Sequence, residues 1–216
     1  MKDSRKKAEK KSFKPGTMLN PVPVVMVSCG KKPEDYNIIT VAWTGVVNSE
    51  PPMVYVSVRR SRFSHHIIKE AGEFVINLTT EELARATDYC GCRSGSKVDK
   101  FKEMKLTPGK SVKLETPTIE ESPINLECRV REIIEYPSHD MFVGEIVNVQ
   151  VAPEYVDSRG KILYEEAGLI SYCHGEYYGL KKKPLGRFGF SVMKAKTKKR
   201  LNKISRDRSR NRKKNK

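Results

Sequence analysis

Apolar and β-branched residues gather along the chain in short runs that have the length of β-strands. The first runs are residues 24–29 and 37–43, and residues 53–59 follow a loop rich in Gly, Asn and Ser. Runs of this kind, bounded by Gly, Pro and Asn, are typical of strands. Because only short loops separate them, we expect antiparallel pairing or a barrel. A βαβ arrangement would need a helix between the strands.

Helices enter the pattern after these strands, and capping residues mark two of their starts. Ser64 can cap a helix that Gly72 ends. Thr79 and Glu82 have the spacing of a capping box, which predicts a second helix that continues to about Cys90. The remaining predicted elements are a short helix near 98–104 and strands over 73–78, 126–136, 141–151, 169–173 and 176–180, with one long hairpin centred on 137–139.

Positive charge is concentrated at the two ends of the chain. The 216 residues include 42 Lys+Arg and 26 Asp+Glu, a net charge of +16. Residues 1–16 carry +5 and residues 194–216 carry +12, which leaves −1 for the body. We therefore expect a disordered basic tail over 1–16, one domain over 17–193 and a second disordered basic tail over 194–216. The second tail either associates with polyanions such as nucleic acid or only keeps the protein soluble.

Several classes of protein are excluded by what the chain lacks. No apolar run approaches the roughly 18 residues of a membrane-spanning helix, and the N-terminus has no apolar stretch of the kind found in secretory signals. An odd number of cysteines, five, favours a reducing cytoplasm over a disulfide framework. The common phosphate-binding and hydrolase motifs are missing. Cys90-Gly91-Cys92 is spaced more tightly than the ligand pairs of zinc sites, so we expect no metal.

Several segments, taken in order, resemble the flavin reductase-like family. They are residues 37–45, 48–58, Arg59, 62–64, 74–78, 94–96 with 99–101, and 139–145. The closing stretch, residues 171–180, looks like the flavoredoxin branch of that family. The resemblance covers about residues 18–193 and stops at the basic tail.

This resemblance implies a fold, a cofactor and an activity. The fold is mainly β with flanking helices, a six-stranded antiparallel Greek-key split β-barrel that binds FMN near the interface of a homodimer. The activity is that of a flavin-dependent oxidoreductase or an electron-transfer flavoprotein, with NAD(P)H or a redox protein as electron donor. The alternative is a protein that acts by polyanion association through residues 194–216.

The resemblance also implies the residues that contact FMN. Its phosphate needs cations or hydroxyl donors, and a helix N-terminus adds free N–H groups. Arg59, Arg62 and Ser64 provide one such place, and Ser96 with Lys100 a second. The full set of expected cofactor ligands is Thr40, Ala42, Trp43, Thr44, Ser49, Ser57, Val58, Arg59, Arg62, Ser64, Asn77, Ser96 and Lys100.

Some of these residues have a second interpretation that the sequence leaves open. Trp43 either flanks the flavin ring or lies in the core, and Asn77 either contacts flavin or stabilises a turn. Arg59 and Arg62 are otherwise surface cations. His139 occupies the place of a family histidine near the nicotinamide or flavin, although the preceding Pro137 and Ser138 depart from the family's Gly-Asp. We expect it to be either catalytic or a solvated residue at a hairpin tip.

Overall fold

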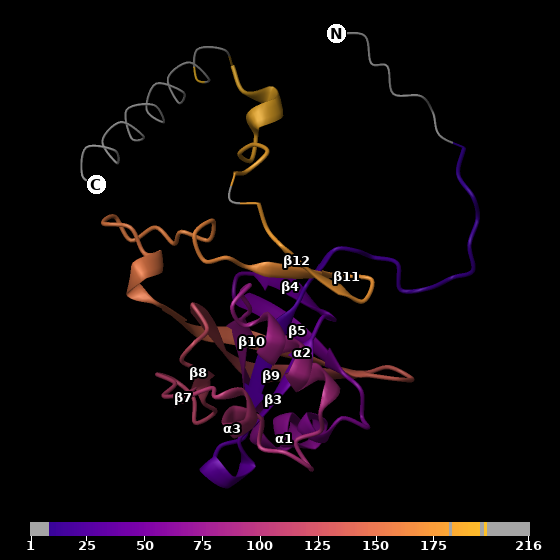
Figure 1. The fold of residues 1–216 in the computed structure, drawn as a ribbon, viewed down its shortest axis with the longest axis vertical. Helices are drawn as coiled ribbons and strands as arrows, with labels where there is room; N and C mark the ends of the chain where they lie inside the picture. The colour runs from indigo at the N-terminus through magenta and orange to yellow at the C-terminus, as the bar shows by residue number, and fades with distance from the viewer. Residues whose placement is uncertain (1–8, 182, 195–196, 198–216) are drawn as a thin grey trace. The chain divides into compact units, whose positions relative to one another are not determined.

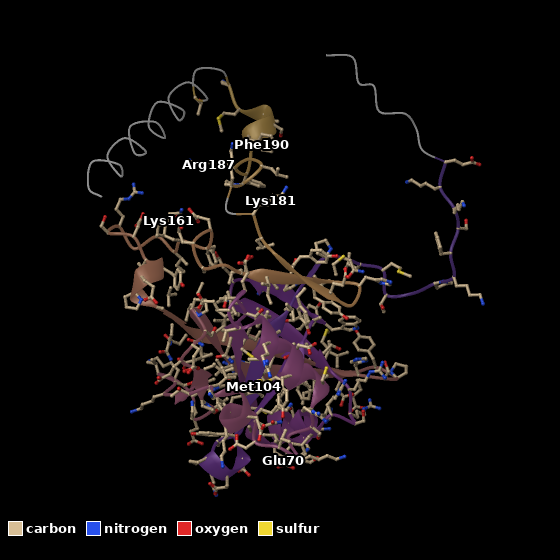
Figure 2. The ribbon with its side chains drawn as sticks, viewed as in Figure 1. Glu70, Met104, Lys161, Lys181, Arg187 and Phe190 are labelled. Carbon is tan, nitrogen blue, oxygen red and sulfur yellow. The ribbon has the colours of Figure 1, made fainter. Side chains whose placement is uncertain are left out.

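The computed structural model describes residues 9–181, 183–194 and 197. The chain divides into two units, residues 1–180 and residues 181–216. In the second unit the described residues include one short 3₁₀ helix, η3 (Phe190–Val192), and Figure 2 labels its Phe190. Most of the 194–216 tail lies outside the described residues, so its expected disorder stays a prediction. Among the described residues, no helix is long and apolar enough to span a membrane.

The first unit is built on a sheet of seven antiparallel strands in the order β3-β2-β6-β9-β10-β5-β4. The strands are β2 (Val25–Cys29), β3 (Asn37–Val41), β4 (Thr44–Ser49), β5 (Pro52–Val58), β6 (Glu73–Leu78), β9 (Ile124–Glu135) and β10 (Asp140–Val151). The predicted strands and the long hairpin of β9 and β10 are confirmed. Mainly β structure with few helices is also confirmed (Figure 1).

The sheet curls so far that its two edge strands come together. β3 and β4 stand at opposite ends of the strand order, yet only Ala42 and Trp43 separate them in the chain. Three Cα–Cα steps span at most about 11 Å, so the two edges must be close in space. Ser57 N donates a hydrogen bond of 2.9 Å to Trp43 O, which ties this connection to β5. The expected split barrel therefore follows from the topology.

The strand β4 was not expected, because residues 44–50 look like a Gly/Asn/Ser loop. It pairs with β5 along one side only, and its outer half is exposed, including Val46 and Val47. A solvent-facing edge strand needs no buried apolar residues, so its sequence carries no clear hydrophobic pattern. It makes the main sheet seven-stranded where six strands were predicted.

Two small sheets and two further 3₁₀ helices complete the first unit. β1 (Val22–Pro23), β11 (Ile170–Cys173) and β12 (Glu176–Gly179) form a three-stranded sheet in the order β1-β11-β12. β7 (Pro108–Gly109) pairs with β8 (Thr118–Ile119). The 3₁₀ helices are η1 (Pro33–Asp35) and η2 (Pro153–Tyr155). In Figure 1, β4, β11 and β12 lie at one end of this unit, and the helices α1 (Phe63–Ala71) and α3 (Lys100–Met104) lie at the other.

The first helix, α1 (Phe63–Ala71), ends as expected but begins differently. Gly72 ends it in the left-handed conformation with φ +67°. Ser64, the expected cap, lies inside the helix, and Arg62 is the N-cap residue without a side-chain cap bond. Ser64 Oγ instead accepts a hydrogen bond of 2.7 Å from Asn37 Nδ2. The Ser64 hydroxyl therefore binds Asn37, a residue distant in sequence, and does not cap the helix.

The second helix, α2 (Ala84–Cys92), begins later than predicted, and the capping box of Thr79 is wrong. Thr79 Oγ1 donates to Val24 O at 2.6 Å, and Thr80 Oγ1 accepts from Leu83 N at 3.2 Å in the turn before the helix. The short helix α3 (Lys100–Met104) is confirmed, with Asp99 as its cap.

Both faces of β2 are buried, which explains its uninterrupted apolar sequence. Val25 and Val27 belong to the barrel core with Phe74 and Phe142. Met26, which points to the other face, packs with α2 and α3 in a second cluster. Figure 2 labels Met104 of α3, which packs against this cluster, and Glu70 on α1, which is exposed. Helices α2 and α3 thus cover this face of β2, and α2 packs against β3.

Candidate functional site

A cleft of about 600 Å³ opens where β3 and β5 end. Its walls come from the connection between β3 and β4, the loop after β5, helix α2, the turn between β9 and β10, and the hairpin of β11 and β12. Of the predicted site residues, those that line it are Thr40, Ala42, Trp43, Ser57, Val58, Arg59, Arg62 and His139. Residues from positions 40 to 139 of the sequence are brought together in this cleft.

Trp43 forms part of the cleft wall and is not a core residue. It belongs to the two-residue connection that closes the barrel, and 40% of its surface is exposed. The interpretation of Trp43 as a core residue is therefore wrong. A half-exposed indole offers a flat apolar face to a planar ligand.

Two arginines and a helix start give the cleft a positively charged end. Arg59 and Arg62 line the cleft, and Arg62 is the N-cap residue of α1. The first N–H groups of a helix have no acceptor within the helix, and no side chain caps this one. Free N–H groups, a helix dipole and two guanidinium groups are suited to an anion such as phosphate.

A smaller pocket of about 70 Å³ continues from this end of the cleft. It shares Ile39, Arg62 and Gly91 with the cleft and is also lined by Ser64 and Lys100. The predicted ligands Ser64 and Lys100 therefore lie beside Arg62. Ser96 is exposed and lines neither pocket; its hydroxyl is 2.9 Å from Ser94 Oγ.

Lys100 is a buried cation whose hydrogen bonds are made to the backbone. Its Nζ donates to Ile38 O at 2.6 Å and to Cys90 O at 2.9 Å. Burial lowers the pKa of this amine from its ordinary value. Lys100 therefore joins α3 to β3 and α2. These two bonds use two of the three N–H donors of its ammonium group, so one donor remains for a ligand.

Besides Ser96, three predicted ligands line neither the cleft nor the smaller pocket, and a further one, Thr40, lines the cleft but uses its hydroxyl elsewhere. Thr44 is buried with Oγ1 donating to Tyr55 O at 2.7 Å, and Ser49 is exposed at the end of β4. Asn77 is fully buried and donates to Met26 O at 3.0 Å, while its Oδ1 accepts from Ile119 N at 2.9 Å. The structure therefore places the Asn77 side chain between strands and away from the cleft. Thr40 lines the cleft, but its hydroxyl donates to Thr87 O.

His139 is half-buried in the turn between β9 and β10 and lines the cleft, so it is more than a solvated tip residue. Its Nδ1 lies 2.8 Å from Ser138 Oγ. Burial and the positive charge of Arg59 lower the pKa of its imidazole. His139 is therefore a largely neutral group at neutral pH, close to the positively charged end of the cleft.

One wall of the cleft was missed by the sequence analysis. Asp88 and Cys92 of α2 and Tyr172 and Tyr177 of the β11–β12 hairpin line it. Tyr172 and Tyr177 are paired across the hairpin, with ring centroids 5.6 Å apart in an edge-to-face arrangement. The two tyrosines lie on the separately predicted strands 169–173 and 176–180, and the short turn between these strands was the available signal. Asp88 could be found only from the packing of α2.

Cysteines differ in exposure and so in reactivity. Burial raises the pKa of Cys29 to about 12 and that of Cys90 to about 11, which keeps both thiols protonated. Cys92 is exposed and lines the cleft. Within the part of the chain that the structure describes, no three His, Cys, Asp or Glu side chains are grouped so that they could hold a metal ion.

Residues 17–181 match the sequence model of the flavin reductase-like domain. The chain therefore belongs to the flavin reductase-like family, a family of flavin-related oxidoreductases. A flavoredoxin of Desulfovibrio vulgaris (Miyazaki F) superposes with a TM-score of 0.79 at 28% identity and covers 85% of this chain and 100% of its own.

Two further proteins resemble the chain. A flavoredoxin from Methanosarcina acetivorans superposes with a TM-score of 0.77 at 31% identity and covers 86% of this chain and 100% of its own. An uncharacterised protein of Archaeoglobus fulgidus is 36% identical over 141 residues, which are 65% of this chain and 78% of the relative. The expected flavoredoxin-type family and its split-barrel fold are confirmed.

Proposed function

We propose that the cleft binds FMN and that the chain is an FMN-dependent oxidoreductase or electron carrier of the flavoredoxin type. The observation that carries this proposal is the pairing of a flat, partly apolar wall with a cationic end. Trp43 lies on the wall, and Arg59 and Arg62 lie in the loop that leads from β5 into α1. FMN has the same two parts, a planar ring system and a dianionic phosphate. When bound, FMN supplies reversible uptake of a hydride or of single electrons.

The phosphate of FMN is assigned to the cationic end. Arg59 and Arg62 provide the charge, and the N–H groups at the start of α1 provide donors. The smaller pocket with Ser64 and Lys100 adjoins Arg62 and offers further polar contacts. The donor set of this chain therefore fits a phosphate.

The ring is assigned to the wall formed by the β3–β4 connection and the end of β5. Ala42, Trp43, Ser57 and Val58 line this part of the cleft. Ser57 N already donates to Trp43 O, so this amide orients the wall, and we assign other backbone amides of the same segment to the ring edge. Fixed backbone donors favour the negative charge that a flavin gains on reduction.

His139 is assigned a hydrogen-bonding role toward the bound ring or its electron donor. Because Ser138 Oγ engages Nδ1, the Nε2 atom is the one that we assign to the ligand. The lowered pKa keeps this imidazole neutral, so it does not add a third positive charge beside Arg59.

We also propose that the protein is a homodimer. This is supported by Val46 and Val47, large apolar side chains that β4 leaves exposed. Val46 has 77% of its surface exposed on an edge strand, where pairing with a second copy would cover both the side chain and the strand edge.

The visible spectrum of the purified protein tests the proposed cofactor. We expect a yellow protein that releases FMN on denaturation, or a colourless one that takes up added FMN stoichiometrically. A protein that does neither would contradict the proposal. Anaerobic reduction by NADH or NADPH, compared with a reduced ferredoxin-type donor, then separates a reductase from an electron carrier. Rapid reduction by a pyridine nucleotide indicates a reductase.

A further inference from the structure

Asp140, which lies just outside the cleft, has both carboxylate oxygens engaged, one by the guanidinium group of Arg60 and the other by the imidazole of His65. Its side chain is 1% exposed. Oδ1 accepts from Arg60 Nε at 2.8 Å, and Arg60 Nη2 lies at the same distance. Oδ2 lies 2.8 Å from His65 Nε2. A buried carboxylate with this many charge-assisted contacts is held in a single position.

The partners of Asp140 are neighbours in sequence of the residues at the cationic end of the cleft. Arg60 directly follows Arg59 and stands two residues before Arg62, and His65 lies in the first turn of α1. Asp140 itself directly follows His139. One carboxylate therefore joins the loop after β5, the start of α1 and the turn between β9 and β10.

Further contacts tighten the same junction. In the sheet, Asp140 is paired with Val58 of β5 and with Glu135 of β9. Arg60 Nη2 also donates to Tyr136 O at 3.2 Å and lies 3.6 Å from Glu135 Oε2. These contacts of Arg60 are all made to the β9–β10 hairpin, and Arg59 and Arg62 are the arginines of this loop that line the cleft.

We propose that Asp140 is a positioning residue for the anion-binding end of the cleft: through Arg60 and His65 it fixes the loop that presents Arg59 and Arg62 to the phosphate of the cofactor. This inference rests on the proposed function. Two guanidinium groups can share one phosphate only if the loop between them has a defined conformation, because a flexible loop loses affinity when it is ordered on binding. Asp140 provides that order before the ligand arrives.

A second buried carboxylate provides a matched control. Glu127 of β9 is also fully buried and accepts hydrogen bonds from Val112 N, Lys113 N, Asn148 Nδ2 and Gln150 Nε2. It holds a different loop, and it lines neither the cleft nor the smaller pocket. Glu127→Gln should perturb the fold as Asp140→Asn does, without changing how a phosphate is bound.

The test compares the affinity of the full-length apoprotein for FMN with its affinity for riboflavin, which lacks the phosphate. In the wild type we expect FMN to bind more tightly than riboflavin. Asp140→Asn should lower the affinity for FMN and leave the affinity for riboflavin unchanged. The ratio of the FMN affinity to the riboflavin affinity should then fall about tenfold, the usual effect of disturbing one charge-assisted contact. If Asp140 had only a structural role, Asp140→Asn would lower the affinities for FMN and for riboflavin equally.

Further variants keep the outcome decisive. Arg60→Lys retains the charge at an exposed position but loses the paired contact with Asp140, so it should lower the ratio even if Asp140→Asn fails to fold. In a background of Arg59→Ala and Arg62→Ala, Asp140→Asn should cause no further loss in the ratio, because the residues act through the same contact.

Two results separate the failure of this inference from the failure of the proposed function. If Arg59→Ala with Arg62→Ala lowers the ratio while Asp140→Asn and Arg60→Lys do not, the positioning role is overturned and the phosphate site stands. If the double arginine variant leaves the ratio unchanged, the phosphate site itself is wrong. A drop in the ratio for Glu127→Gln as large as for Asp140→Asn would show a general loss of stability and would also overturn the inference.

Discussion

Tyr177 donates a hydrogen bond from its hydroxyl to Asp88 Oδ1 at 3.2 Å and so links β12 to helix α2 along one wall of the cleft. Burial and the negative charge of Asp88 raise the pKa of Tyr177 well above its ordinary value, so the hydroxyl remains a donor at alkaline pH. The tip of the hairpin is also held by His174 N, which donates to Asn20 Oδ1 at 3.2 Å. The β11–β12 hairpin is thus held beside the cleft by helix α2 and by the segment that precedes β1.

Loss of the Tyr177 hydroxyl should loosen this wall. We expect Tyr177→Phe to increase the rate of FMN release about threefold to tenfold, because one hydrogen bond to a charged acceptor is lost while the aromatic ring is kept. Stopped-flow release of FMN measures this rate. Tyr178→Phe, on the same strand but outside the cleft lining, is the control and should leave the rate unchanged.

Trp43 is the only tryptophan in the chain, and it lies in the cleft wall. Its fluorescence should therefore be strongly quenched when FMN or riboflavin binds. Trp43→Ala should weaken both flavins alike, by about 1 kcal/mol, because it removes an aromatic contact to the ring and leaves the phosphate site intact. Equilibrium dialysis measures the affinities. Unquenched fluorescence in a protein that has bound flavin would place the ring elsewhere.

The exposed valines of β4 predict the effect of a charge on assembly. Val46→Glu should shift the proposed homodimer toward the monomer, because a carboxylate would be buried without a partner at the interface. Analytical ultracentrifugation reports the change. Val112→Glu, at an exposed apolar position away from β4, is the control and should leave the mass in solution as in the wild type.

The basic tail over 194–216, most of which lies outside the described residues, predicts a salt-dependent property. The full-length protein should bind single-stranded nucleic acid with an affinity that falls steeply as salt increases, since each neutralised phosphate releases a counterion. A chain that ends at residue 193 should lose most of this binding and keep its affinity for FMN. Retention of nucleic-acid binding by the shortened chain would assign it to the body.

Glu127 predicts how stability depends on pH. Burial alone would raise the pKa of this carboxylate, but hydrogen bonds from two backbone amides and two side-chain amides outweigh burial and hold the pKa below its ordinary value. The folded state therefore binds the proton more weakly than the unfolded state. The stabilisation is present above the ordinary glutamate pKa of about 4.3 and is lost as the pH falls below it.

Thermal unfolding between pH 3 and pH 7 measures this effect. At pH 7, Glu127→Gln should lower the free energy of unfolding by about 1–3 kcal/mol. Its stability should also depend less on pH below 5 than that of the wild type. Equal pH dependence in the two proteins would show that another carboxylate is responsible.

Local pattern was enough to predict most of the strands, because their signal comes from burial. β2 and β6 are buried on both faces and appear as apolar runs, and the β9–β10 hairpin has two long strands around one turn. β4 was not predicted because an exposed edge strand buries few side chains and so shows no clear apolar pattern. The cap at Ser64 and the capping box at Thr79 failed for a different reason. Both hydroxyls are used by residues that are distant in sequence, Asn37 and Val24.

The candidate site was predictable to the extent that its residues follow directly on strands. The segments after β3 and β5 carry Trp43 and Arg59 into the cleft because a barrel strand ends there. Asn77 looked equivalent at the end of β6, but its neighbours in the fold are Met26 and Ile119, and its amide is used between strands. Asp88 reaches the cleft only because α2 packs against β3, where Gly91 leaves room for Thr40.

The two-residue connection between β3 and β4 has a consequence for unfolding. Ala42 and Trp43 close the barrel, and the same residues form the wall against which a planar ligand would pack. Separation of the barrel's two edges would therefore destroy the cleft in the same event. A ligand bound there would hold the two edges of the barrel together. On heating, release of the ligand and the first separation of these edges should therefore occur together.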